Sequence, residues 1–172
     1  MIESVGPSVS KLQYARSGFT IVELLIVIVV IGILAAIVIV AYNGVQNRAY
    51  DTTVQSDMVA MAKKIELQAV TTSGTYSGLT VATGIKITKS AYDTAENNLY
   101  YCINPYTNKY ALSARSRTKK DYKVINGVLS EHSSKLYGAS TCDLVRTSPG
   151  ETLNADLGWN AAGPTWSPWA QG

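Results

Sequence analysis

The side chains suited to acid–base or nucleophilic chemistry are few, and their spacing does not suggest a catalytic site. The chain has one histidine, His132, in the segment SEHSS beside Glu131 and Ser133. Neighbours in sequence do not make a triad, because a triad depends on geometry in space, and no Gly-x-Ser-x-Gly motif is present. We therefore expect no enzymatic activity.

Metal or redox chemistry has equally little support. The two cysteines, Cys102 and Cys142, are far from CxxC spacing, and a single histidine cannot complete a zinc site with them. The net charge of +3 on 172 residues is mild, without the long basic tract of a dedicated nucleic-acid binder. We expect no metal or cofactor.

One carboxylate stands inside an apolar run. Between Phe19 and Tyr42 every residue is apolar except Thr20, Glu23 and Gly32. As a helix, this run is long enough to cross a hydrocarbon core of about 30 Å, which excludes a plain soluble domain. A carboxylate at membrane depth costs about 2.5 to 3.5 kcal/mol on insertion scales, so Glu23 has a functional partner, reaches the interface or is protonated.

A polar leader precedes the apolar run. It carries Lys11 and Arg16 and ends on Gly18, whereas a secretory signal peptide is cut after its apolar stretch. Any cleavage would therefore remove the polar leader. The positive-inside rule keeps this end in the cytoplasm and exports the residues after about position 43, which predicts an N-in, C-out topology.

The octapeptide GFTIVELL, which begins at Gly18, resembles the class III signal segment of type IV pilins and pseudopilins. The resemblance implies cleavage by prepilin peptidase after Gly18, whose missing side chain lets the backbone enter the protease, and N-methylation of Phe19. It also implies that Glu23 pairs with the Phe19 ammonium of a neighbouring subunit and sets the axial register. Thr20 receives no role beyond bonding within its own helix or packing.

Gly32 lies within the apolar helix, where glycine lowers helical stability by about 1 kcal/mol relative to alanine. It either allows close approach of neighbouring helices or marks the point where the helix melts in the filament, as in some members of the resembled family. Many members have a proline in this region, whereas here none lies between Pro7 and Pro105. This absence weighs against melting.

An apolar stripe at helical spacing continues beyond the membrane run. Its members are Tyr50, Val54, Met58, Met61, Ile65 and Ala69. Their spacing of three and four predicts one helix from Phe19 to about Val70. Its second half should lie against a sheet, as the resemblance to pilins also implies.

Four short segments rich in aromatic or β-branched residues predict an antiparallel meander: residues 98–103, 109–114, 121–125 and 128–131. Asn126-Gly127 favours a two-residue type I′ turn. We expect residues 76–96 to be a connecting loop with a short strand at 85–88 and a helical turn near 91–97. The predicted fold is α+β, with a leader (1–18), a transmembrane and filament-core helix (19–42), its amphipathic continuation (43–72) and a globular head (73–172).

The two cysteines belong to the head and, if it is exported, favour a disulfide. A bridge would close about 41 residues and stabilise the head by up to roughly 4 kcal/mol. In many pilins a disulfide pins the C-terminal segment to the sheet, and joining Cys102 to Cys142 would do the same. Two reduced structural cysteines are the alternative.

Two features of the head suggest ligands. A basic segment contains Lys109, Arg115, Arg117, Lys119, Lys120 and Lys123. It predicts contact with an anionic ligand such as DNA or a cell surface, repeated along a filament, or else a solvated hairpin tip.

The tail holds Trp159, Trp166 and Trp169, which stack on sugars or pack on the head or the next subunit. Tyr100, Tyr101, Tyr106 and Tyr110 are expected to pack on the sheet.

The resemblance as a whole implies a prepilin, the precursor of a filament subunit. Its partners would be other pilin subunits, prepilin peptidase, the pilus assembly platform and the membrane. It would occupy the cytoplasmic membrane before assembly and an extracellular pilus afterwards, serving adhesion, twitching motility or DNA uptake. The alternatives are a pseudopilin of a type II secretion-like system and a monomeric membrane-anchored binding module, which would keep its leader and be indifferent to Glu23.

Overall fold

The computed structural model describes residues 18–76 and 84–172. It divides into two compact units, residues 1–41 and 42–172, which are considered separately below. Except for Gly18, the predicted leader lies outside the described residues.

Helix α1 spans Ile21–Thr71. Its end agrees with the predicted end near Val70, but it begins two residues after Phe19, because Thr20 occupies the capping position. Gly32 and Gly44 both lie inside the helix. Among the described residues, α1 is the one helix long and apolar enough to cross a membrane.

The second unit uses α1 as one wall of its core. The predicted stripe is buried from Val54 onward, and Met58, Met61 and Ile65 are almost fully inaccessible. Tyr50 is half-buried and packs against this core. Asp51, which is not a member of the predicted stripe, is buried as well, and its partners are described below.

The main sheet has six antiparallel strands in the order β5-β4-β3-β2-β6-β7. Their bounds are β2 Asn98–Asn104, β3 Lys109–Arg115, β4 Asp121–Ile125, β5 Val128–His132, β6 Asn154–Asn160 and β7 Thr165–Trp166. The four predicted strands are confirmed, and Asn126 and Gly127, with φ of 47° and 83°, connect β4 to β5 as the predicted type I′ turn requires. The expectation of about four strands was too low, because β6 and β7 extend the sheet beyond β2.

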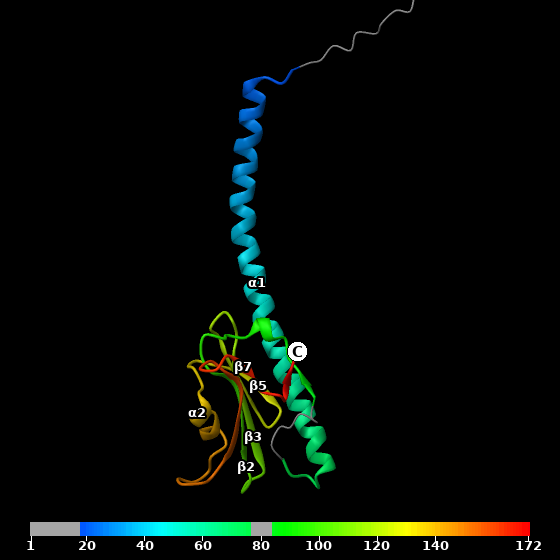
Figure 1. Ribbon diagram of the computed structural model, residues 1–172, viewed down its shortest axis with the longest axis vertical. Helices are drawn as coiled ribbons and strands as arrows, with labels where there is room; N and C mark the ends of the chain where they lie inside the picture. The colour runs from blue at the N-terminus through cyan, green and yellow to red at the C-terminus, as the bar shows by residue number, and fades with distance from the viewer. Residues whose placement is uncertain (1–17, 77–83) are drawn as a thin grey trace, which may run out of the picture. The chain divides into compact units, whose positions relative to one another are not determined.

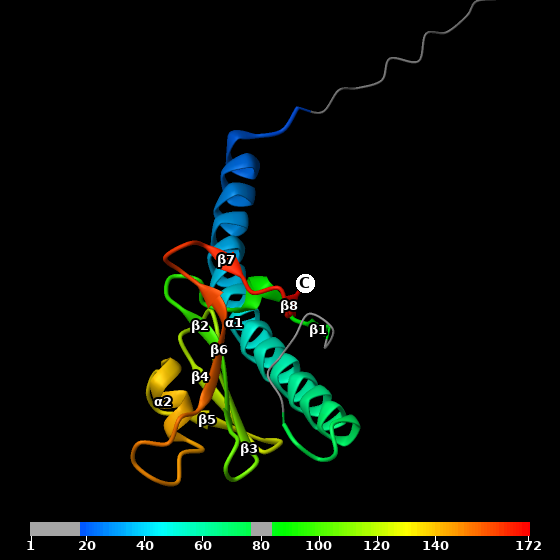
Figure 2. The same cartoon turned by 60° about the horizontal axis from the view of Figure 1, so that its bottom comes forward.

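Sequence patterning missed β6 for a physical reason. The strand reads NADLGWN, and asparagine, aspartate and glycine are depleted in strands. Its place is determined by pairing with β2, where Tyr100 faces Leu157 and Cys102 faces Ala155. β6 and β7 thus form the edge of the sheet beyond β2, and both are labelled in Figure 2.

A second, parallel pair joins β1 (Ile85–Lys86) to β8 (Ala170–Gln171). The short strand expected at 85–88 is therefore present but shorter. The helical turn expected near 91–97 is instead the 3-10 turn η2 at Lys89–Ala91. Residues 77–83 of the expected connecting loop lie outside the described residues.

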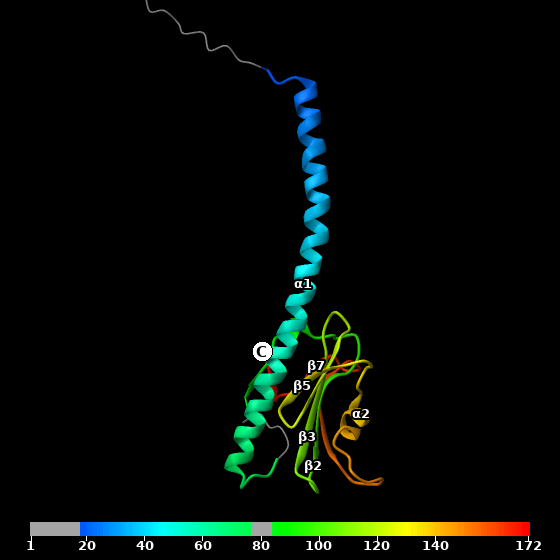
Figure 3. The ribbon, with the colours of Figure 1, turned by 180° about the vertical axis from the view of Figure 1, so that it is seen from behind.

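Within the second unit the sheet lies between two helices, with residues 42–71 of α1 on one face and α2 (Gly138–Asp143) on the other (Figures 1 and 3). Alternate residues of β2 and β3, such as Tyr101 and Leu112, join the core with α1. The intervening positions, including Cys102 and Ser113, face α2. This arrangement explains why both central strands are buried along nearly their whole length.

Candidate functional site

The start of α1 is closed by a reciprocal pair of hydrogen bonds. The Glu23 backbone N–H donates to Thr20 Oγ1 at 3.2 Å. The Thr20 backbone N–H and hydroxyl each donate to Glu23 Oε2 at 2.8 Å. This is a capping box, in which a threonine and a glutamate three residues later satisfy the first free N–H groups of a helix.

The capping box gives Glu23 a structural partner within its own chain. A carboxylate is also favoured at a helix N-terminus, where the macrodipole is positive. Thr20, which received no independent role from the sequence, is therefore the cap that holds the Glu23 side chain in place. The Thr-x-x-Glu spacing in Thr20-Ile-Val-Glu23 was the signal that sequence reasoning missed.

The rest of the first unit exposes apolar surface. From Ile21 to Tyr42 the exposed fraction of the large apolar side chains runs from 48% at Val30 to 84% at Ile21. A patch this large is incompatible with water and requires lipid or other protein around it. Phe19 is 83% exposed. A Cβ added to Gly18 or Gly32 would meet nothing within 4 Å, so neither glycine is required by packing within the described chain.

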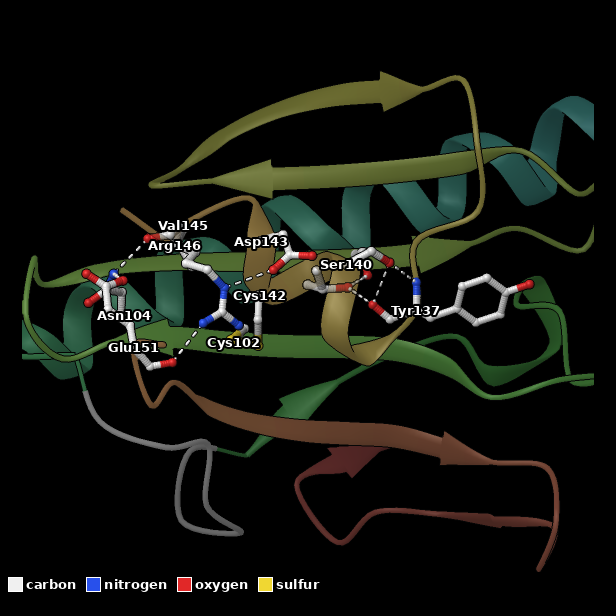
Figure 4. Close-up of a disulfide and its surroundings, with 11 residues drawn as sticks. Cys102, Asn104, Tyr137, Ser140, Cys142, Asp143, Val145, Arg146 and Glu151 are labelled. Atoms are coloured by element: carbon white, nitrogen blue, oxygen red, sulfur yellow. Dashed lines mark hydrogen bonds and ion pairs between the residues drawn. A yellow bond between two sulfur atoms is a disulfide. The ribbon is translucent and has the colours of Figure 1, made fainter. Parts of the chain in front are cut away.

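On the head, a disulfide joins Cys102 of β2 to Cys142 of α2, which confirms the expected pairing (Figure 4). Next to it, Ser113 Oγ and Thr141 Oγ1 lie 2.6 Å apart, and both side chains are buried. The bridge and this hydrogen bond together attach α2 to the outer face of the sheet.

The loop after α2 is held by hydrogen bonds that the side chains of Asn104 and Arg146 donate. Asn104 Nδ2 donates to the Val145 carbonyl at 2.8 Å and to Glu151 Oε2 at 3.0 Å. Arg146 bonds Asp143 Oδ1 at 2.9 Å and the Glu151 carbonyl at 2.7 Å, as Figure 4 shows. These hydrogen bonds, close to the disulfide, hold the loop that leads to β6.

The basic segment is not one continuous cationic patch. Lys109 and Arg115 lie at opposite ends of β3. Three of the six cations are paired with carboxylates: Arg115 with Asp121, Lys119 with Asp93 and Lys120 with Asp51.

Arg115 forms two parallel bonds with Asp121, at 2.9 Å and 2.8 Å. Burial alone would raise the pKa of Asp93, but the hydrogen bond and charge of Lys119, with the Ala95 N–H, hold that pKa below its ordinary value. These pairs reduce the positive field of the segment. Contact of the six residues with an anionic ligand stays a prediction.

The tryptophans of the tail pack on the head. Trp159 and Trp169 are buried and Trp166 is half-buried. Trp159 Nε1 donates to the Thr94 carbonyl at 3.1 Å, and the ring centroids of Trp159 and Trp166 are 5.1 Å apart.

The tyrosine cluster mostly packs on the sheet, as expected. Tyr100, Tyr101 and Tyr110 are buried, whereas Tyr106 is 68% exposed.

Comparison with known proteins finds one family model and two curated relatives. The prokaryotic N-terminal methylation motif matches residues 14–39. Fimbrial protein Q of Moraxella bovis is 35% identical over 83 residues, which are 48% of this chain and 46% of that protein. The type IV major alpha-pilin of Moraxella bovis is 46% identical over 46 residues, 27% of this chain and 29% of that protein.

The chain thus matches less than half the length of these curated relatives. No solved structure matches it. The relatives are structural subunits, in agreement with the expectation that the chain is not an enzyme. The chain therefore carries the prokaryotic N-terminal methylation motif of fimbrial and type IV pilin subunits at the start of an α+β, type IV pilin-like architecture.

Proposed function

We propose that this chain is the precursor of a subunit of a type IV pilus-like filament, cut after Gly18 and assembled through residues 19–42. The observation that carries the proposal is the apolar first half of α1, exposed on all sides with Glu23 as its single charge. Such a segment is suited to two environments in succession, lipid before assembly and neighbouring helices afterwards. Both are apolar, so transfer between them costs little hydrophobic free energy.

Glu23 would supply the specificity that apolar contacts lack. In the precursor its carboxylate accepts hydrogen bonds from Thr20. Cleavage after Gly18 creates a new ammonium on Phe19, which becomes N-methylated and pairs with Glu23 of a neighbouring subunit. A displaced register would leave two charges unpaired in an apolar core, so one register is favoured.

The proposal includes a route. The leader stays in the cytoplasm, residues after about 43 are exported, prepilin peptidase cuts the chain, and the assembly platform transfers it to an extracellular filament. The filament would then serve adhesion, twitching motility or DNA uptake. Deletion of the gene for this chain should abolish at least one of these three activities.

Mass spectrometry of purified filaments tests the processing step. We expect a mature chain that begins with N-methylated Phe19. Gly18→Val should give an uncut chain with an unchanged head, because a side chain at Gly18 meets nothing within 4 Å. An intact Met1 terminus in assembled filaments would refute the processing step, and an uncut wild-type chain that forms no filaments would favour an anchored monomer.

Electron microscopy tests the role of Glu23. Glu23→Ala should insert into the membrane but form few or no filaments, whereas Glu131→Ala, the same change on the exposed strand β5, should assemble normally. Normal filaments from Glu23→Ala would refute the register role. Short periplasmic filaments in place of surface ones would identify a pseudopilin.

A further inference from the structure

A polar cleft of about 440 Å³ lies in the head between the η2 turn and the connection from β3 to β4. Its lining includes Lys89, Ser90, Asp93, Thr94, Arg117 and Lys119. Its volume falls within the range of small-molecule sites, about 300 to 1,000 Å³. All the lining residues belong to the second unit. None of them lies in the apolar segment proposed for assembly.

The cleft carries an excess of positive charge. Asp93 is already engaged, because one of its carboxylate oxygens accepts from Lys119 Nζ at 2.7 Å and the other from the Ala95 N–H at 3.1 Å. The other two cations of the cleft are Lys89 and Arg117, and neither forms an ion pair with another described residue. Two cations therefore line the cleft without a carboxylate of their own.

Aromatic rings position both of these cations. The Arg117 guanidinium lies 5.4 Å from the Tyr50 ring centroid, and its backbone N–H donates to the Ala91 carbonyl at 2.8 Å. Lys89 Nζ lies 5.9 Å from the centroid of Trp166. A ring orients a cation without neutralising it, so both groups stay able to bind an anion.

Hydroxyl groups line the same cleft. Ser90 and Thr94 are exposed there, beside the two cations. Charged groups bind an anion strongly, and hydroxyls bind the hydroxyls of a sugar. We propose that this cleft binds a sugar bearing one anionic group, a carboxylate or a phosphate, which Lys89 and Arg117 hold while Ser90 and Thr94 contact the ring hydroxyls.

The charge balance favours such a ligand over a nucleic-acid duplex. A duplex is held by a row of cations that neutralise successive phosphates. Here Arg115, Lys119 and Lys120 are each paired with a carboxylate of the second unit. Two cations in one cleft, neither paired with a carboxylate of the described residues, match a single anionic group better than a repeating backbone.

Isothermal titration of the full-length chain in nonionic detergent tests the proposal. The ligands are glucuronate, glucose 1-phosphate, inorganic phosphate and glucose, compared at equal ionic strength. We expect glucuronate or glucose 1-phosphate to bind more tightly than both glucose and inorganic phosphate, and the tighter of the two identifies the anionic group. Equal affinity for inorganic phosphate, or no preference over glucose, would overturn the proposal.

Substitutions locate the site. Lys89→Gln and Arg117→Gln should each weaken binding about tenfold, the loss expected for one hydrogen bond to a charged group. Lys63→Gln and Arg48→Gln make the same charge changes on exposed positions of α1 and should bind like the wild type.

Near-UV circular dichroism of the tail tryptophans confirms folding of each variant. If Arg117→Gln unfolds, Lys89→Gln still decides the question. Unchanged binding in a folded Lys89→Gln variant, or equal losses in all four variants, would contradict the assignment. Binding is measured on unassembled chain, so this test and the filament test fail independently.

Discussion

Asp51 joins α1 to the connection between β3 and β4, and its removal should destabilise the head. Its Oδ1 accepts hydrogen bonds from Ser116 Oγ, at 2.7 Å, and from Thr118 Oγ1. Lys120 Nζ lies 3.2 Å from Oδ2. Asp51 and Ser116 are 7% and 0% exposed, so these bonds are shielded from water.

The magnitude follows from the bonds lost. A hydrogen bond to a charged group contributes about 1.5 to 3 kcal/mol, and the two hydroxyl bonds at the lower end give about 3 kcal/mol for Asp51→Ala. Lys120 adds little, because its side chain is 52% exposed. Asp51→Asn keeps an oxygen for the two hydroxyls and loses only the charge, so we expect about 1 kcal/mol.

Urea unfolding of the full chain in nonionic detergent measures these differences through the three tryptophans, all of which lie in the head. Asp143→Ala is the matched control, because Asp143 also pairs with a cation, Arg146, but its carboxylate is far more exposed than that of Asp51. Its removal should cost less than about 0.5 kcal/mol. If Asp51→Ala destabilises no more than this control, the assigned contribution of Asp51 is wrong.

The contribution of Asp51 should also depend on pH. Burial alone would raise its pKa, but hydrogen bonds from Ser116 and Thr118 and the nearby Lys120 ammonium hold the pKa below its ordinary value. The stabilisation is therefore present above about pH 4, the ordinary pKa of aspartate, and is lost as the pH falls through the lower pKa of the folded state. The stability difference between wild type and Asp51→Asn should shrink over that acidic range and stay constant near neutral pH.

Three further outcomes are expected. Replacing Cys102 and Cys142 together by alanine should lower the free energy of unfolding by about 4 kcal/mol, and a reducing agent should match that loss in the wild type. Asn98→Ala should cost about 2 to 4 kcal/mol in urea unfolding, because both ends of the Asn98 amide are hydrogen-bonded to backbone groups at the start of β2; a loss below 1 kcal/mol would contradict this. Thr20→Val should speed hydrogen exchange at the first amides of α1 while Thr20→Ser should not, and equal exchange in both would show that the cap is dispensable.

Local patterns predicted the parts of the fold that depend on local geometry. The spacing of Val54, Met58 and Ile65 identified the buried face of α1, because helical periodicity alone decides which side chains share a face. The Asn126-Gly127 turn likewise predicted the β4–β5 hairpin. The capping box was also local, and its Thr-x-x-Glu spacing was overlooked rather than absent.

Elements that depend on distant partners could not be predicted in the same way. Strand β6 has weak strand propensity, and its pairing with β2 supplies the order that its own residues do not. Asp51 falls outside the apolar stripe, and its burial could not be predicted from local spacing, because its partner Ser116 lies 65 residues away along the chain.

The sequence by itself determined the character of the N-terminal segment. An apolar run with a single carboxylate at Glu23, preceded by Gly18 and Phe19, is recognisable without coordinates, because composition and short-range spacing define it. Only the tertiary structure decided the character of the head. Of the six cations between Lys109 and Lys123, three form ion pairs, and Arg117 lines a cleft together with the distant Lys89. Coulomb interactions depend on distances in space, and those are determined by how β3, η2 and α1 pack.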